Sequence, residues 1–323
     1  MRTIKYSKAW QIHIVIILMM VLFFSACKKG DGAVELTIAS YNVRYYNEYD
    51  VRNGNGWERR LPILCNLVRY HDFDIFGAQE VLDNQLSDML KHLDGYDYVG
   101  VGRDDGLRDG EYSPIFYRRD KFEVLQSGNF WLSESPEVPV KGWDAALPRI
   151  CSWAEFRLVE NGDIFWFFNT HFDHIGVEAR QNSAELIIAK IKELAGDRKA
   201  ILTGDLNTDQ NSEPYKLVLA SGLFDDAYDM ADVRYILNGT FNNFNLANKT
   251  EERIDHIFLP KGMKVTRYGV LTDYYLAPSI AEAPKEGAVG ATNTTGVANI
   301  SETYVSRLPS DHYPVVAKIR MVK

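Results

Sequence analysis

Short runs of β-branched and aromatic residues alternate along the chain with segments whose apolar residues recur every three or four positions. The first kind predicts strands over residues 36–43, 73–80, 113–118, 122–125, 152–159, 164–169, 199–204, 253–259, 265–271 and 315–319. The second kind predicts helices over residues 57–71, 84–93 and 178–194. Because no regular strand–helix–strand period is present, we expect two packed sheets with helices on their outer faces.

The N-terminus has the pattern of a targeting segment. A basic start over residues 1–10 precedes an apolar stretch at 12–24, and small residues then precede Cys27. This order predicts a signal peptide of the bacterial lipoprotein type over residues 1–27, with Cys27 lipidated. An ordinary secretory signal or an uncleaved anchor is the alternative. Residues 28–34 would then form a tether, and we expect the protein in the cell envelope, lipid-anchored outside the cytoplasm, or secreted.

Composition narrows the class of protein. With 46% hydrophobic and 25% charged residues, the chain is typical of a globular protein. Its net charge of −8 argues against a protein that coats nucleic acid without regard to sequence. A nuclease stays open, because bound cations can supply positive charge locally. We expect one catalytic domain over residues 35–323, present as a monomer.

Two further features of the chain leave alternatives open. A polar segment without periodicity predicts a flexible insertion at about residues 277–306, which either overhangs the functional site or has no role. Besides Cys27, the chain has Cys65 and Cys151, for which we predict two buried free thiols. A disulfide is chemically allowed outside the cytosol.

Polar side chains recur where predicted strands end. They are Asn42, Glu80, His171, Asp205, Asn207, Asp255 and His312. Carboxylate and amide oxygens suit Mg²⁺, Mn²⁺ or Ca²⁺ better than zinc. His171 and His174 are spaced so that they point in different directions on an extended segment, which disfavours a zinc pair. The motifs of P-loop NTPases and of α/β-hydrolases are absent from the sequence.

Six short motifs follow one another along the chain. They are SYNVR at 40–44, GAQEV at 77–81, NTHF at 169–172, GDLN at 204–207, RIDHI at 253–257 and SDHYPV at 310–315. This set resembles the endonuclease/exonuclease/phosphatase superfamily over about residues 35–321. Residues 143–149 look most like uncharacterised bacterial members near the deadenylase and nocturnin branch. The resemblance implies an α/β (α+β) fold, a four-layered α/β/β/α sandwich of two mainly antiparallel sheets with outer helices.

The resemblance also implies roles for individual residues. Glu80, Asn42 and Asp311 would hold Mg²⁺ (or Mn²⁺). Asn42, Arg149 and His171 would contact the substrate phosphate, and Glu111 would orient His171. The catalytic set would be Asp205, His312, His171, Asn207, Asp311 and Asp255. Asp205 would activate a water molecule and His312, held by Asp311 or Asp255, would stabilise the reacting phosphorus group, although which of the two is the base stays open.

Three functions are compatible with these residues. The first is a metal-dependent phosphoester hydrolase of the phosphodiesterase, nuclease or exonuclease kind, with nucleic acid among its substrates. The second is a phosphatase or phosphodiesterase of small phosphoesters such as inositol phosphates, phospholipid head groups or sugar phosphates. The third is a binding protein without catalysis, which the presence of every expected reactive residue disfavours. A continuous basic groove would favour the polymer, and a closed pocket with one or two basic residues the small substrate.

Overall fold

The computed structural model describes residues 33–235, 238–279 and 303–321. The predicted signal peptide with Cys27, and the tether up to residue 32, lie outside these residues, so both stay predictions. Within the described ranges, no helix combines the length and the apolar character needed to cross a membrane.

Two large mixed sheets form the body of the described protein. The first has seven strands in the order β10 (Ala231–Tyr235), β12 (Lys264–Val270), β15 (Val315–Met321), β1 (Val34–Asn42), β2 (Ile75–Gln79), β4 (Ile115–Arg118) and β3 (Tyr96–Val99). The second has six in the order β5 (Phe122–Trp131), β6 (Ile150–Leu158), β7 (Ile164–His171), β8 (Ala200–Asp205), β11 (Asp255–Pro260) and β9 (Phe224–Asp226). Three neighbouring pairs in these sheets are parallel, namely β1–β2, β10–β12 and β7–β8, and the others are antiparallel.

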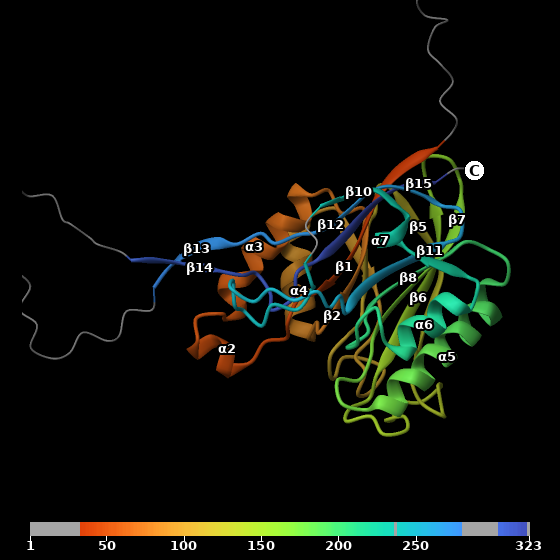
Figure 1. Ribbon diagram of the computed structural model, residues 1–323, viewed down its shortest axis with the longest axis horizontal. Helices are drawn as coiled ribbons and strands as arrows, with labels where there is room; N and C mark the ends of the chain where they lie inside the picture. Colours follow the sequence, from red (N-terminus) through yellow and green to blue (C-terminus); the bar gives the residue numbers. More distant parts are fainter. Residues whose placement is uncertain (1–32, 236–237, 280–302, 322–323) are drawn as a thin grey trace, which may run out of the picture.

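Helices cover the outer faces of both sheets. Helices α3 (Trp57–Tyr70) and α4 (Asp83–His92) pack on the first sheet, and α5 (Val177–Ala195) and α6 (Glu213–Ala220) pack on the second. Figure 1 shows the two helix layers on opposite sides of the paired sheets. Two shorter helices, α2 (Glu48–Arg52) and α7 (Ala227–Met230), lie in connections. The predicted four-layered α/β/β/α sandwich is confirmed.

Strand β7 shows why its sequence is almost continuously hydrophobic. Successive side chains of a strand point to opposite faces. Phe165 and Phe167 accordingly join the core between the two sheets, whereas Trp166 and Phe168 join the core under α5 and α6. Each large side chain buried in this way contributes about 1.5–3 kcal/mol. A strand covered on both faces therefore needs apolar residues at nearly every position.

A buried polar contact joins the two sheets near the ends of β2 and β7. The Asn169 amide donates to the carbonyl of Ala78, and its oxygen accepts hydrogen bonds from Gln79 and Thr203. A Cβ atom at Gly77 would lie 2.1 Å from Asn169 Oδ1, so only glycine allows the sheets to approach this closely. This contact fixes the relative position of the strand ends that carry the predicted reactive residues.

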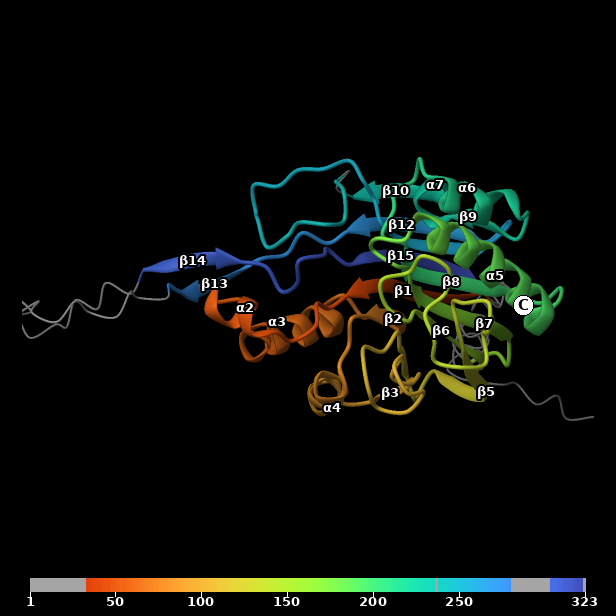
Figure 2. The same ribbon diagram turned by 90° about the horizontal axis from the view of Figure 1, so that it is seen from below.

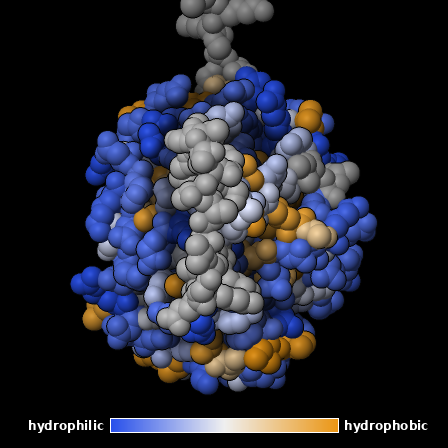
Figure 3. Space-filling model, turned by 90° about the vertical axis from the view of Figure 1, so that its left-hand side faces the viewer, coloured by the Kyte–Doolittle hydropathy of each residue, from blue (hydrophilic) through white to orange (hydrophobic). Residues whose placement is uncertain are grey.

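The predicted insertion at 277–306 is loop only in part. Its ends pair as an antiparallel ribbon of β13 (Tyr275–Pro278) and β14 (Tyr304–Arg307), and residues 280–302 lie outside the described chain. Figures 1 and 2 show the ribbon projecting from the two sheets. The face viewed from that end is mostly hydrophilic, with a few hydrophobic groups (Figure 3).

Both cysteines of the described chain are buried free thiols, as predicted. Cys65 belongs to the core under α3, and Cys151 belongs to the core under α5 and α6. The first sheet and the second sheet thus separate them, and no disulfide joins them.

Candidate active site

The predicted reactive residues meet at one end of the sandwich. Asn42, His171 and Asp205 are the last residues of β1, β7 and β8, and Asp255 is the first residue of β11. Because β11 runs antiparallel to β8, Asp255 lies directly opposite Asp205. A cavity of about 360 Å³ opens at this end. It is lined by Arg44, Tyr45, Glu80, Glu111, Leu147, Arg149, His171, His174, Asp205, Asn207, Phe241, Asp311 and His312.

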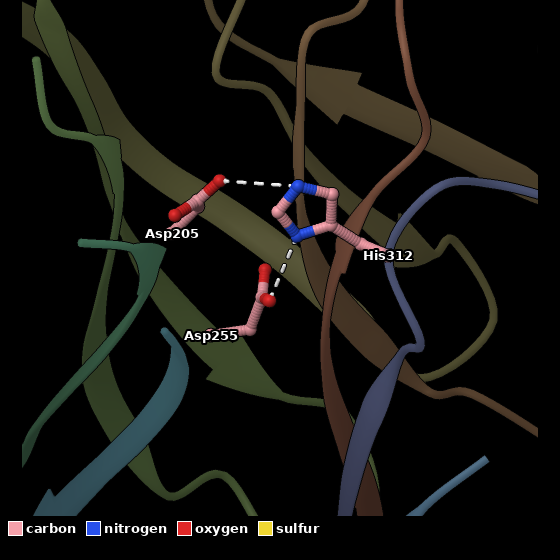
Figure 4. Close-up of side chains that lie close together, drawn as sticks. All are labelled: Asp205, Asp255 and His312. Atoms are coloured by element: carbon pink, nitrogen blue, oxygen red, sulfur yellow. Dashed lines mark hydrogen bonds and ion pairs between the residues drawn. The ribbon is translucent and has the colours of Figure 1, made fainter. Parts of the chain in front are cut away.

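Asp205, Asp255 and His312 form a buried cluster (Figure 4). His312 Nδ1 lies 2.9 Å from Asp255 Oδ2, and its Nε2 lies 3.8 Å from Asp205 Oδ2. Burial lowers the pKa of His312, but the two adjacent carboxylates outweigh it and raise the pKa to about 10. Burial raises the pKa of Asp205, and the neighbouring Asp255 adds to the effect, so that it reaches about 7. The cluster can therefore hold an imidazolium beside a carboxylate that accepts a proton near neutral pH.

Glu80 and Asp311 form a second acidic pair on the other side of Asn42. The Asn42 amide donates to Glu80 Oε1 and to Asp205 Oδ2, both at 3.0 Å, so it holds the two carboxylates in place. Arg44 Nη1 lies 3.4 Å from Asp311 Oδ2 and 4.0 Å from Glu80 Oε2. Burial raises the pKa of Asp311. Glu80 and Arg44 adopt left-handed backbone conformations, with φ of 61° and 59°, which are unusual for residues with a side chain.

The oxygen atoms of this second pair fit a divalent cation. Glu80 and Asp311 supply carboxylate oxygens, the hard ligands that Mg²⁺ or Mn²⁺ prefers. The predicted ligand Asn42 turns its N–H groups toward Glu80 and Asp205, and its amide oxygen accepts from the backbone N–H of Arg44 at 3.0 Å. Ligand atoms of Asp205, Asp255 and His312 also lie within 4.8 Å of one another. That cluster fits a cation less well, because one ring nitrogen of His312 is bonded to Asp255 and a protonated imidazole has no lone pair to offer.

His171 is fixed by Asn207 rather than by a charged partner. The Asn207 amide donates to the Phe172 carbonyl and to His171 Nε2, each at 2.9 Å. Because Nε2 accepts, the neutral ring carries its proton on Nδ1. Burial, followed by the charges of Arg149 and Arg103, holds the pKa of His171 well below its usual value. His171 is therefore a neutral imidazole in this site.

Glu111 interacts more closely with Arg103 than with His171, the residue it was predicted to orient. Arg103 donates to both of its carboxylate oxygens, at 2.7 and 3.0 Å, whereas His171 Nδ1 lies 3.9 Å away. The desolvation of Glu111 raises its pKa, and Arg103 opposes that shift. The orientation of His171 by Glu111 stays a prediction, and Arg103 is the residue that holds Glu111.

The predicted phosphate-contacting Arg149 lies in the wall of the cavity. Its Nε donates to Asp173 Oδ2 at 3.2 Å, and its Nη2 lies 2.9 Å from His174 Nδ1. Within the described residues, Nη1 is buried without a hydrogen-bond partner. A guanidinium with an unused donor beside a cavity is suited to an anionic ligand.

Arg60 and Ser310 join the early and late parts of the site. The Ser310 hydroxyl donates to the Asn42 carbonyl at 2.7 Å. The fully buried Arg60 donates to the carbonyl groups of Val43, Arg44 and Pro309, with distances of 2.7–3.0 Å. These bonds place Asn42 beside the segment that carries Asp311 and His312.

Several residues of the site lie outside the predicted set, among them the polar residues Arg44, Arg103, Asp173 and His174. Arg44 belongs to the motif at 40–44, and Asp173 and His174 come just after the motif at 169–172, so their position in or next to those motifs was the available signal. Arg103 follows no motif, and only the turn that pairs it with Glu111 identifies it.

Comparison with known proteins places the chain among phosphoester hydrolases. The model of the endonuclease/exonuclease/phosphatase family matches residues 39–312. A family protein of known structure from Bacteroides thetaiotaomicron is 49% identical, covers 90% of this chain and 98% of its own, and has a TM-score of 0.81.

Two further solved structures define the range of similarity. A mannosyl-6-phosphatase from Bacteroides thetaiotaomicron is 50% identical over 88% of this chain and 99% of its own, with a TM-score of 0.79. The catalytic domain of human nocturnin is 16% identical over 88% of this chain and 93% of its own, with a TM-score of 0.62. The latter similarity concerns the fold.

Proposed function

This chain belongs to the endonuclease/exonuclease/phosphatase family and hydrolyses phosphoester bonds, and we propose that it is a divalent-cation-dependent phosphatase of small phosphomonoesters. We further propose that sugar phosphates are its substrates. The single observation that carries the proposal is the cavity, whose volume of about 360 Å³ is suited to a small molecule.

The charges around the cavity favour a small substrate over a nucleic acid. Among the lining residues the only cations of fixed charge are Arg44 and Arg149. A polymer-binding enzyme needs a series of basic residues along the phosphate backbone. The net charge of −8 points the same way. Arg44 is paired with Asp50 and Asp311, and the unused donor of Arg149 matches a single phosphate group.

The similar mannosyl-6-phosphatase supports the sugar-phosphate class. It shares half of its residues with this chain over almost its entire length. Transfer of its substrate class to this chain is part of the proposal, because substrate choice depends on loops around the cavity as well as on the reactive residues.

A divalent cation would be held by Glu80 and Asp311, with Asn42 beside them. When bound, it would supply Lewis-acid stabilisation of negative charge on the phosphoryl group. Asn42 orients Glu80 and Asp205 through its two N–H groups, and therefore relates the predicted cation site to the predicted base.

Asp205 and His312 take different roles toward the protons of the reaction. Asp205, whose pKa is raised to about 7, takes the proton of the attacking water, as a base of matched pKa does efficiently. The His312 imidazolium donates toward a phosphoryl oxygen as charge develops there, while Asp255 holds its other nitrogen. A bond forms between the water oxygen and phosphorus and the ester P–O bond breaks. The leaving oxygen takes up a proton from solvent, Asp205 releases its proton to solvent, and the products are an alcohol and inorganic phosphate.

The test is a comparison of substrates with the purified protein. We expect Mg²⁺-dependent release of phosphate from mannose 6-phosphate, with kcat/KM at least about tenfold higher than for single-stranded RNA or DNA. A chelator should abolish the release, and added Mg²⁺ should restore it. Preferential cleavage of an internal phosphodiester would contradict the proposal, as would full activity in chelator.

We also propose that the protein is a lipid-anchored monomer of the cell envelope. The support is the sequence pattern ending at Cys27. Replacement of Cys27 by serine should release the protein from the membrane fraction, and light scattering of the soluble form should give the mass of one chain. Retention of the Cys27→Ser protein in membranes would contradict a lipid anchor.

A further inference from the structure

His174 lies at the cavity and has no part in the reaction described above. It follows β7 by three residues, lines the cavity, and has a side chain that is 48% exposed. The other imidazoles of the cavity, His171 and His312, are buried and bonded to reactive residues. Among the imidazoles of the cavity, His174 is therefore the one most accessible to a ligand group that lies away from the buried reactive residues.

The hydrogen bond from Arg149 fixes the state of the His174 ring. A guanidinium group can donate but cannot accept, so His174 Nδ1 accepts from Arg149 Nη2 across 2.9 Å. The ring is thus neutral, and its remaining proton is on Nε2. Within the described residues, Nε2 has no hydrogen-bond partner in the protein. The His174 ring therefore has one N–H group, at Nε2, that can donate a hydrogen bond to a ligand.

Asp173 holds this arrangement in place. Its Oδ1 accepts from the backbone N–H groups of Ile175 and Gly176, at 3.0 and 2.8 Å. Its Oδ2 accepts from Arg149 Nε and from the backbone of Leu147, at 3.2 and 3.3 Å. These hydrogen bonds hold the pKa of Asp173 below its usual value against the effect of burial. A permanently ionised, buried carboxylate thus positions both Arg149 and the backbone next to His174.

With a phosphate group at Arg149, His174 would lie on the alcohol side of the ester. Arg149 is the predicted contact of the phosphate, and His174 lies one hydrogen bond beyond it, at the more exposed part of the cavity. Leu147, whose side chain is also exposed, lines the same cavity. An N–H donor near an apolar surface suits a sugar, which presents hydroxyl oxygens and a C–H face.

We propose that His174 Nε2 donates a hydrogen bond to a hydroxyl oxygen of the sugar in a sugar phosphomonoester, and thereby selects this class of substrate. The inference rests on the proposed phosphatase function. Arg149 and Asp173 act as positioning residues for this contact, because they fix which nitrogen of His174 carries the proton.

The experiment compares two esters with similar leaving groups. Mannose 6-phosphate has ring hydroxyls, and cyclohexylmethyl phosphate has a six-membered ring without them. For His174→Phe we expect kcat/KM with mannose 6-phosphate to fall roughly 3- to 10-fold, mainly through KM, as the loss of one hydrogen bond predicts. We expect kcat/KM with cyclohexylmethyl phosphate to change less than about twofold, because the ring of that ester has no hydroxyl oxygen to accept the bond.

Two further variants separate recognition from structure. His174→Gln keeps an acceptor for Arg149 and a donor for the sugar, so it should retain most of the activity on mannose 6-phosphate. Ile175→Ala, at the exposed neighbouring residue, serves as the matched control and should behave as the wild type. Inhibition by inorganic phosphate should be the same in the wild type and in His174→Phe.

Three results with the phenylalanine variant would overturn the proposal. These are equal losses on both esters, no loss on either ester, or weaker inhibition by phosphate in His174→Phe, which would show that His174 acts through Arg149 on the phosphate. A glutamine variant as impaired as the phenylalanine variant would exclude a hydrogen bond as the cause. Failure of the phosphatase function itself is distinguishable, because the wild type would then release phosphate from neither ester in Mg²⁺.

Discussion

Strand β11 carries two neighbouring residues that enter two different buried carboxylate–histidine pairs. Asp255 pairs with His312 at the cavity, with 2.9 Å between Oδ2 and Nδ1. The next residue, His256, points to the opposite face of the sheet, where its ring packs against aromatic side chains. Its Nδ1 lies 3.6 Å from Asp226 Oδ2. The two pairs share residue types and burial, yet one lies in the active site and the other lies in the core.

The number of donors around each carboxylate explains the difference. Asp226 accepts from Tyr215, from Arg253 and from the backbone of Tyr228, at 2.8–2.9 Å. Burial raises the pKa of Asp226, but His256, Arg253 and these bonds outweigh it, so the pKa falls to about 2. Asp205 accepts from Asn42 and from the backbone of Asn207, and it faces a second carboxylate.

A buried carboxylate that accepts hydrogen bonds from several donors stays ionised and stabilises the fold. A buried carboxylate with fewer donors has a raised pKa and can accept a proton near neutral pH. The effects that shift a pKa are the same in both places, and only their balance differs. We therefore expect substitutions at the cavity pair to change turnover, and substitutions at the core pair to change stability.

The largest effect should follow Asp205→Asn. An amide cannot accept the proton of the attacking water, so we expect kcat to fall about 10²–10⁴-fold. The melting temperature should be unchanged or higher, because Asp255 loses a neighbour of like charge. Steady-state kinetics and thermal unfolding measure the two effects. Asp225→Asn, on β9 outside the cavity, is the matched control and should keep wild-type activity; retention of more than a tenth of the activity by Asp205→Asn would refute the assignment.

Asp226→Asn should have the opposite profile. Removal of one partner from a buried ion pair should cost about 3 kcal/mol of the free energy of unfolding, with kcat per folded molecule unchanged within about twofold. Because the pKa of Asp226 is lowered to about 2 in the folded protein, its contribution is present above the unfolded value of about 4 and is lost as pH falls toward 2. Urea unfolding at pH 7, 5 and 3 should show the difference from wild type shrinking below pH 4. A difference that stays constant with pH would contradict the ion-pair explanation.

The pH profile tests the cavity pair more finely. Activity should rise as pH increases through about 7, where Asp205 loses its proton, and fall near 10, where His312 loses its own. Asp255→Asn removes a charge that raises both pKa values, so both limbs should move to lower pH, with a loss of roughly tenfold at pH 8. The measurement is kcat/KM between pH 5 and 10.5. An alkaline limb at the wild-type position would show that Asp255 does not control His312.

Tyr215→Phe should give the smallest effect. It removes one neutral donor to Asp226, so we expect a loss of about 1 kcal/mol in the free energy of unfolding. Turnover should be unchanged. A change in kcat without a change in stability would show that the core pair communicates with the cavity, contrary to the comparison.

Some of these residues and elements can be predicted from the sequence, and others cannot. Motifs predicted that Asp205, Asp255 and His312 belong to the site, and the structure brings the three side chains together. Strong periodicity predicted the helix at 178–194 and the strand at 315–319, which the structure extends to 177–195 and 315–321. Asp226, like Asp205, is the last residue of its strand, so its place at a strand end does not distinguish it from Asp205. Its donors come from α6, α7 and the segment before β11, and only the fold brings them together. Arg103 escaped prediction for the same reason.

Strand β15 lies between β12 and β1 in the middle of the first sheet, although it is the last strand described along the chain. Until it is synthesised, β1 and β12 have unpaired edges, and Asn42 lacks the Ser310 hydroxyl that reaches it from 268 residues away. The order of synthesis thus delays the reactive centre to the end. We therefore expect a nascent chain that lacks residues 310–321 to have no hydrolytic capacity, and its open sheet edges to be exposed to pairing with other strands during that interval.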